Sequence, residues 1–284
     1  MTIVMLPKIK LITDSGADLP ELYKERYQIK VVPLTVIFGE QEFKDQVTMS
    51  REQFWEKLFI SKELPSTNQA NPHEFVKVFQ PYLEQDYTIL YVGLSSQLSG
   101  TLQSANLAKE ILKSSRIHVF DSRTASLGVS LFLIKAGEMI RQEKSIDEIW
   151  KQLDQERTES SAYFILDSLT HLVKGGRLSR AQGVFGTVLN IKPVLQVTPK
   201  GTIEVIERVR STKKALQTIV AKAKEQKIDF RKKRVAVAHT PDDDKAADLI
   251  AIIEKELEPL EIVRGLIGPT IGTHAGPGGL GLLF

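Results

Sequence analysis

An apolar strand that runs through a hydroxyl-rich turn into an amphipathic helix is the feature that most constrains this fold. Residues 88–92 form the strand, Ser95, Ser96 and Ser99 lie in the turn, and residues 102–112 repeat apolar side chains at helical spacing. The turn of such a unit points out of the carboxyl end of a sheet, where open α/β folds bind ligands. The free N–H groups and the dipole at the helix start favour an anionic group there. A plainer alternative is that Ser99 is only the N-cap of the helix.

The remainder of the first half alternates strands with helices. Short apolar runs predict strands, and amphipathic runs that begin with capping residues predict helices. The expected strands are residues 9–12, 29–38 with an interruption at Pro33, 88–92 and 117–120, and helices are expected to begin near residues 20, 50, 71, 102, 124 and 145. This alternation predicts a mostly parallel sheet with helices on both faces, which is a three-layer α/β/α domain.

The pattern changes after about Thr158. The expected elements are a strand at 162–166, helices at 169–174 and 180–189, a hairpin formed by 193–197 and 202–209, a helix at 211–227, a strand at 235–238, a helix at 241–257 and a strand at 261–266, followed by a glycine-rich loop. A chain of 284 residues is long enough for two cores. We therefore predict an N-terminal α/β domain over residues 1–158 and a C-terminal α+β domain over residues 159–284.

Composition and charge exclude several classes of protein. The chain has no cysteine, which excludes disulfides, thiolate zinc sites and cysteine nucleophiles and fits a reducing cytoplasm. Residues 1–7 lack the basic region and cleavage site of a secretory signal, and no apolar run is long enough to span a bilayer. The net charge of +3 is too small to argue for nucleic acid. We expect a cytoplasmic protein without a nucleic-acid partner or stable membrane insertion.

His274 is the most interesting of the five histidines because glycines that permit close backbone approach surround it in the predicted loop. It can donate a hydrogen bond to a carboxylate or phosphate, or it can be a turn histidine satisfied by backbone. A hydrolase triad of His274 with Ser96 or Ser99 and with Asp14 or Asp121 can be assembled on paper. The GxSxG sequence of a nucleophile elbow is absent, so a catalytic triad is a weaker interpretation of His274 than a binding role.

Other patterns are weaker still. Residues 276–281 spell GxGxxG, but no helix follows to bind a dinucleotide, and no Walker A sequence is present. The consecutive acids at 242–244 have no metal-ligand spacing, so we expect no metal and no cofactor. The basic residues between 208 and 234 form either a solvated helix face or a docking surface for an acidic or phosphate-carrying partner. They lack interleaved aromatics, which argues against single-stranded nucleic acid.

Short pieces spread over nearly the whole chain resemble the DegV-like fatty-acid-binding family in their order and spacing. They are Thr13-Asp14-Ser15 with Asp18-Leu19-Pro20, Pro65-Ser66-Thr67-Asn68-Gln69, Gly93-Leu94-Ser95-Ser96 with Leu98-Ser99-Gly100-Thr101, Asp121-Ser122, Gly175-Gly176-Arg177-Leu178, Leu189-Asn190-Ile191-Lys192-Pro193, Arg208-Val209-Arg210 with Lys213-Lys214-Ala215, and Gly272-Thr273-His274. Each piece alone is common, but together they are specific. The resemblance implies a two-domain DegV-like fold with a long-chain fatty acid buried between the domains.

The resemblance also implies site residues and a partner. Thr67 and Ser99 correspond to the residues that hold the carboxylate, and His274 to a histidine close to it. The residues Ser66, Ser96, Gly100, Thr101 and Gly272 are expected as neighbours of the ligand loops. Better-understood members present the acid to a separate ATP-dependent kinase subunit, which makes an acyl phosphate, and Arg177 and Arg210 match arginines involved in that encounter. The chain departs from the family where Asn68-Gln69-Ala70 follows Thr67, which puts the geometry of that loop in question.

These expectations agree with the physics of a buried fatty acid. A buried carboxylate needs hydrogen bonds, which two hydroxyls, a histidine and a helix N-terminus can supply. Each buried methylene of the tail contributes about 0.8 kcal/mol. We expect a ligand such as palmitate or oleate, in a pocket shaped by side chains such as Phe132, Phe164, Phe185 and Val188. The function expected is that of a non-catalytic carrier, and the alternatives are a Ser/His-dependent hydrolase or acyltransferase on a fatty acyl ester and, ranked low, a DNA-associated regulator.

Overall fold

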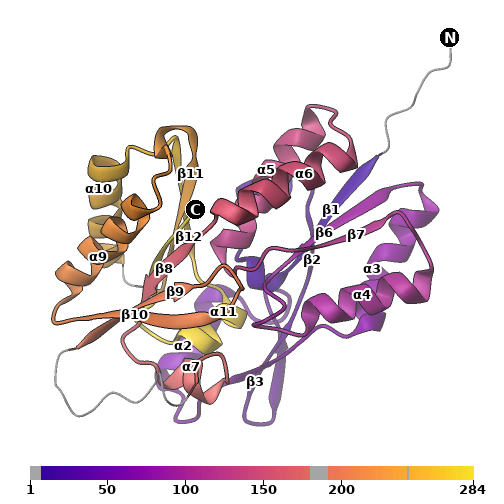
Figure 1. The fold of residues 1–284 in the computed structure, drawn as a ribbon. Coiled ribbons are helices and arrows are strands. Elements are labelled where there is room, and N and C mark those ends of the chain that lie inside the picture. The colour runs from indigo at the N-terminus through magenta and orange to yellow at the C-terminus, as the bar shows by residue number, and fades with distance from the viewer. Residues whose placement is uncertain (1–7, 180–190, 242) are drawn as a thin grey trace.

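The computed structural model describes residues 8–179, 191–241 and 243–284. Two lobes lie side by side, with the first half of the chain in one and the second half in the other (Figure 1). The first lobe contains a parallel sheet of four strands, in the order β2-β1-β6-β7. The strands are β1 (Ile9–Asp14), β2 (Lys30–Val32), β6 (Thr88–Gly93) and β7 (Ile117–Asp121). The predicted parallel sheet is therefore confirmed.

Helices cover both faces of this sheet. Alternate residues of a strand point to opposite faces, so in β6 Ile89 and Tyr91 pack with α3 and α4, whereas Leu90 and Val92 pack with α5. The helices of this lobe are α1 (Glu21–Arg26), α2 (Arg51–Ile60), α3 (Pro72–Glu84), α4 (Thr101–Leu112), α5 (Leu127–Arg141) and α6 (Ile146–Glu159), with the 3-10 turn η1 (Ser15–Ala17). Capping boxes at Ser50, Asn71 and Ser145 begin α2, α3 and α6, as the sequence predicts.

A small antiparallel sheet that the sequence analysis missed extends from this lobe. It has the order β4-β3-β5 and consists of β3 (Thr35–Phe38), β4 (Gln41–Lys44) and β5 (Ser66–Asn68). Strand β5 falls in a segment for which the sequence pattern predicts no strand. Its pairing with β3 sets Thr67 opposite Val36, so the position of Thr67 is fixed by a strand ladder.

The second lobe is built on a mixed sheet of six strands, in the order β10-β9-β8-β13-β11-β12. The strands are β8 (Ala162–Ile165), β9 (Lys192–Val197), β10 (Ile203–Val209), β11 (Arg234–His239), β12 (Glu261–Leu266) and β13 (Leu280–Leu283). The helices are α7 (Thr170–Lys174), α9 (Thr212–Glu225), α10 (Asp243–Leu257) and α11 (Pro269–Ala275), with the 3-10 turn η2 (Phe230–Lys232). The predicted hairpin of β9 and β10 and the predicted two-domain α/β fold are confirmed.

The expected glycine-rich loop at the end of the chain is wrong in two places. Pro269 begins the helix α11, so His274 lies on a helix. Residues 280–283 form β13, which occupies the middle of the sheet between β8 and β11. The helix expected at 180–189 lies outside the described residues. The domain boundary near Thr158 stays a prediction, at a place where α6 ends at Glu159 and β8 begins at Ala162.

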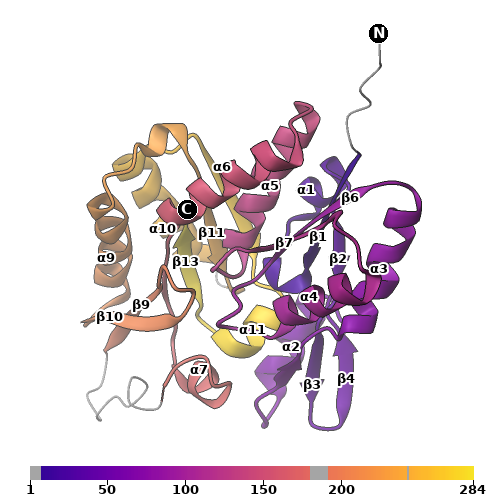
Figure 2. The same ribbon diagram turned by 45° about the vertical axis from the view of Figure 1, so that its right-hand side comes forward.

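The two lobes share a hydrophobic core. One cluster of buried side chains contains Leu11 and Phe120 of the first sheet together with Ala236, Val263 and Leu283 of the second. Helix α5 lies between the sheets and contacts β1, β6 and β11. Helix α11 also lies between the lobes (Figure 2). Among the described residues, no helix is long and apolar enough to cross a membrane.

Candidate functional site

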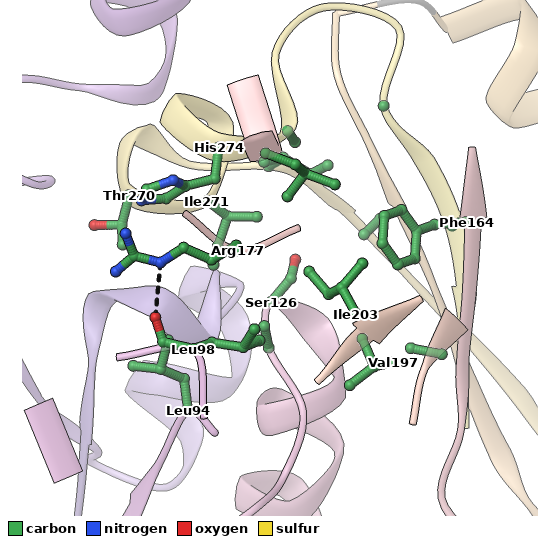
Figure 3. Close-up of a pocket in the computed structure, with 18 of the residues that line it drawn as sticks. Leu94, Leu98, Ser126, Phe164, Arg177, Val197, Ile203, Thr270, Ile271 and His274 are labelled. Atoms are coloured by element: carbon green, nitrogen blue, oxygen red, sulfur yellow. Dashed lines mark hydrogen bonds between the residues drawn. The ribbon is translucent and has the colours of Figure 1, made fainter. Parts of the chain in front are cut away.

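A cavity lies between the two lobes, and both contribute to its walls. The first lobe provides side chains such as Leu34, Leu94 and Leu98, and the second lobe provides side chains such as Phe164, Val197 and Leu283. About 120 Å³ of the cavity is open to water-sized molecules. Thr270, His274 and Arg177 lie on one side of it, Phe164 and Val197 lie on the opposite side, and Ser126 lies between them (Figure 3). The cavity therefore has a polar end and an apolar end.

Thr67 and His274 meet at the polar end. The hydroxyl of Thr67 and Nε2 of His274 form a hydrogen bond of 2.8 Å, although the two residues are far apart in the sequence. Nδ1 of His274 is buried and has no hydrogen-bond partner. Burial, with lesser contributions from the charges of Arg177 and His171, lowers the pKa of His274 to about 4. The imidazole is therefore neutral near pH 7. Its Nδ1 lies against Gly175, since a Cβ at that glycine would be 2.3 Å from this nitrogen.

Arg177 extends from the second lobe to the first. Its Nε donates to the carbonyl of Leu98 at 2.9 Å, and its Nη1 donates to the carbonyl of Gly175 at 2.5 Å. Burial lowers its pKa, but a guanidinium keeps its charge at physiological pH. Arg177 thus provides a positive charge at the polar end of the cavity and connects the lobes across it.

Ser99 lies beside the start of α4 and also faces the cavity. Helix α4 begins at Thr101 with Gly100 as the N-cap residue, so the simple interpretation of Ser99 as the N-cap is wrong. The Ser99 hydroxyl accepts a hydrogen bond from the Thr101 N–H at 3.2 Å and lies 2.9 Å from the Thr101 hydroxyl. Ser99, in the turn before α4, and Thr67, on β5, thus line the same cavity.

Gln69 connects the segment of β5 that carries Thr67 with helix α4, which follows Ser99. It follows β5, and its Nε2 donates to the hydroxyl of Ser104 in α4 at 3.1 Å. Gly100 leaves the room for this crossing, because a Cβ at that position would lie 1.9 Å from Oε1 of Gln69. The departure at Asn68-Gln69-Ala70 therefore leaves the Thr67 segment anchored on both sides, by β3 and by α4.

Buried carboxylates hold the start of α11, which carries His274. Oδ2 of Asp45 accepts from the backbone N–H of Thr270 at 3.0 Å and from its hydroxyl, and Oδ1 of Asp18 accepts from the N–H of Gly268 at 2.8 Å. Burial raises the pKa of Asp18 to about 7 and also raises that of Asp45. The sequence offered no signal for Asp45, since an acid in an exposed-looking turn is usually a surface residue.

Ser126 is a second residue that the sequence analysis missed. It lines the cavity with φ 55° and ψ −142°, a backbone conformation that is strained for a residue other than glycine. Its hydroxyl donates to Oδ2 of Asp18 at 2.5 Å, and its N–H donates to the carbonyl of Gly16 at 2.8 Å. These bonds hold the strained turn in place next to the ligand space.

Several expected neighbours do not line the cavity. Ser66 is exposed, and the Ser96 hydroxyl donates to Asp121 at 2.6 Å. Arg210, which was expected to act in the encounter with a partner and not in the cavity, is exposed beyond β10. Gly100 and Thr101 follow Ser99 at the start of α4 and do not line the cavity. Gly272 packs against α2, where a Cβ would lie 2.5 Å from Phe54 and 3.0 Å from Trp55. Of the expected tail residues, Phe164 lines the cavity, Phe132 faces a different cleft, and Phe185 and Val188 lie outside the described residues.

The candidate hydrolase triad is not assembled through its two aspartates. Asp14 accepts from the hydroxyl of Tyr91 at 2.6 Å and from the N–H of Gly16 at 2.9 Å, and Asp121 accepts from Ser96. Neither carboxylate is hydrogen-bonded to His274. The described residues also contain no group of three or more histidine, aspartate or glutamate side chains that could hold a metal ion.

Comparison with known proteins gives the family. The model of a family of uncharacterised proteins, the DegV family, matches residues 8–284. The chain belongs to the DegV family. The resemblance seen in the sequence is thereby confirmed.

Similar members of the DegV family match the chain over almost its whole length. A DegV domain-containing protein of Caldanaerobacter subterraneus subsp. tengcongensis is 38% identical over 279 residues, which are 98% of this chain and 99% of the relative. The solved structure of a fatty-acid-binding DegV family protein from Thermus thermophilus is 31% identical with a TM-score of 0.90 and covers 97% of this chain and 98% of its own. The Streptococcus pneumoniae Fatty Acid Kinase (Fak) B3 protein, solved loaded with linoleic acid, is 26% identical with a TM-score of 0.86 and covers 98% and 99%.

Proposed function

We propose that this protein binds a long-chain fatty acid in the cavity between its lobes and carries it without transforming it. The carboxylate lies at the polar end, where Thr67, Ser99 and His274 donate hydrogen bonds to it. The acyl tail fills the apolar end. The observation that carries the proposal is the polarity of the cavity, in which hydroxyls, an imidazole and a guanidinium face one end of an otherwise hydrocarbon-lined space.

Several properties of the polar end support a carboxylate there. A desolvated carboxylate requires hydrogen-bond donors, and charge-assisted bonds are stronger than neutral ones. The neutral His274 with an unpartnered nitrogen avoids the cost of a second buried charge, while Arg177 supplies a cation. Related structures point the same way, since the Streptococcus pneumoniae Fak B3 protein was solved loaded with linoleic acid and a DegV family protein of Ruminococcus gnavus with vaccenic acid.

We further propose that the bound acid is presented to a separate, ATP-dependent fatty acid kinase subunit, which forms an acyl phosphate. The similarity to the Fak B3 protein supports this partner. Arg177, next to the carboxylate, stabilises the charge that develops during phosphoryl transfer, and the exposed Arg210 contacts the kinase. When kinase subunit and ATP are added, wild type is expected to yield acyl phosphate and Arg177→Ala to yield little.

The first test is native mass spectrometry of the purified protein, followed by denaturing extraction of any lipid. We expect a one-to-one adduct of fatty-acid mass. Ser99→Ala and Thr67→Val each remove one hydrogen bond to a charged group, so each is expected to weaken retention about 10- to 100-fold. Ser96→Ala is the matched control, because its hydroxyl lies in the same turn but bonds to Asp121.

The same samples separate a carrier from a hydrolase. A hydrolase turns over a fatty acyl ester, and Ser99→Ala abolishes that turnover, whereas a carrier retains the intact acid and shows no turnover. A bare protein after incubation with several fatty acids contradicts the proposal.

A further inference from the structure

The floor of the cavity is one face of the six-stranded sheet. Side chains alternate between the two faces of a strand, so Ala162 and Phe164 of β8 face the cavity while Tyr163 and Ile165 belong to the core on the other side. On the neighbouring strand, Gly281 faces the cavity directly beside Phe164, because the two residues are paired in the ladder. The largest cavity-facing side chain of the sheet, that of Phe164, therefore lies next to a residue that has no side chain, Gly281.

The two residues are close enough to constrain each other. A Cβ at Gly281 would lie 2.9 Å from Cβ of Phe164 and 3.3 Å from the carbonyl oxygen of Tyr163. Gly281 does not have a positive φ, so its glycine is explained by this crowding and not by backbone conformation. The missing side chain makes room for Phe164 to sit across the strand.

Phe164 stands between two parts of the cavity wall. It is only partly buried and packs against two clusters, one that includes Leu166 and Leu195 and another that includes Ala162 and Ala238. Ala162 precedes Phe164 on the same face of β8, and Ala238 lies in the same row of the sheet as Phe164, on the far side of Gly281. The ring is the bulkiest side chain on the sheet floor next to these two alanines.

We propose that Phe164, seated across Gly281, selects the acyl tail by its length. The ring sets how far a tail extends from the polar end along β8 toward Ala162. This inference rests on the proposed function and assigns the choice of ligand to a residue pair. It makes opposite predictions for the two positions. Phe164→Ala opens the space beyond the ring, whereas Gly281→Ala adds a methyl group and pushes the ring into the cavity.

The test is a competition among laurate, myristate, palmitate, stearate and arachidate at equal concentrations, read out by native mass spectrometry. Phe164→Ala is expected to shift the bound distribution toward longer tails, with occupancy rising about fourfold for each additional buried methylene. Gly281→Ala is expected to shift it toward shorter tails. The double variant is expected to lie between the two single variants, because the residue at 164 keeps its Cβ and the contact with the added methyl group remains.

Ile165→Val is the matched control, because it lies on β8 but faces the opposite core, and its distribution is expected to equal that of wild type. Circular dichroism verifies that each variant is folded. If Gly281→Ala fails to fold, the change in bound tail length caused by Phe164→Ala is the result that tests the inference. Unchanged distributions in variants that still bind lipid overturn this inference and leave the proposed function intact, whereas a wild type that binds none of the five acids overturns both.

Discussion

At the scale of single residues, His274 combines burial with a hydrogen bond to Thr67. Its pKa of about 4 lies below the ordinary value of 6.5 in an unfolded chain. Between these values the unfolded state binds the proton more tightly, so this residue lowers stability as the pH falls from about 6.5 toward about 4. Asp14 and Asp18 act in the opposite direction, because burial raises the pKa of the first to about 6 and of the second to about 7.

Comparison with His274→Gln isolates the histidine, because the aspartates are common to both proteins. We expect ligand-free wild type to lose about 2 kcal/mol more unfolding free energy than the variant between about pH 7 and about pH 5. Urea unfolding at both pH values measures the difference. Equal losses in the two proteins would show that His274 keeps an ordinary pKa.

At the scale of elements, helix α11 depends on close packing against α2. Gly272 has no room for a side chain beside Phe54, and the indole N–H of Trp55 donates to the carbonyl of Ile267 at 2.9 Å. Gly272→Ala is therefore expected to destabilise the protein by about 1–3 kcal/mol and to weaken fatty-acid binding by moving His274.

Phe54→Leu tests the cause of that loss. If the clash with Phe54 is responsible, the double variant with Gly272→Ala is less destabilised than the sum of the two single variants, by about 0.5 kcal/mol or more in chemical denaturation. Additive losses would place the effect elsewhere in α11.

The elements that sequence reasoning found and missed differ in what holds them. Capping residues and periodic apolar side chains are local signals, and they gave α2, α3 and α6 their starts. Strand β5 is three polar residues long and exists because β3 pairs with it, and β13 contains a glycine that only its neighbour Phe164 explains. Helix α11 is flanked by Gly268 and Gly276 and is held by carboxylates distant in sequence. Propensity is overridden by tertiary contacts in all three.

In the candidate site, too, some residues can be found from local sequence signals and others only from contacts in the folded protein. The turn around Ser99 and the position of His274 could be singled out from residue types, and the structure brings both to the cavity together with Thr67 and Arg177. Hydrogen bonds of four further side chains hold the segments around those residues in place, namely the side chains of Asp18, Asp45, Gln69 and Ser126. Nothing in the sequence around them indicates this, because each acts through a contact made in the folded protein.

At the scale of the whole molecule, the cavity walls come from both lobes and one core runs through them. A ligand in the cavity therefore stabilises the molecule as a unit. At a hundredfold excess over its dissociation constant, a fatty acid contributes about 2.7 kcal/mol, which raises Tm by about 5 °C in a single transition. Differential scanning calorimetry measures this shift, and the methyl ester of the same acid, which lacks the carboxylate, is expected to give a smaller one. Two separate transitions, of which only one moves, would contradict it.

The central place of β13 has a consequence for the order in which the chain folds. During synthesis β8, β9 and β10 emerge first, and β11 and β12 follow, but neither group bonds directly to the other. The edges of β8 and β11 that face each other gain a hydrogen-bonded neighbour only when residues 280–283 form β13 between them. Until those residues leave the ribosome, two strand edges remain open to pairing with other chains, a state that invites chaperone binding or aggregation. Completion of this sheet thus depends on the last of its strands to be synthesised, whereas the strands of the parallel sheet are all complete at Asp121.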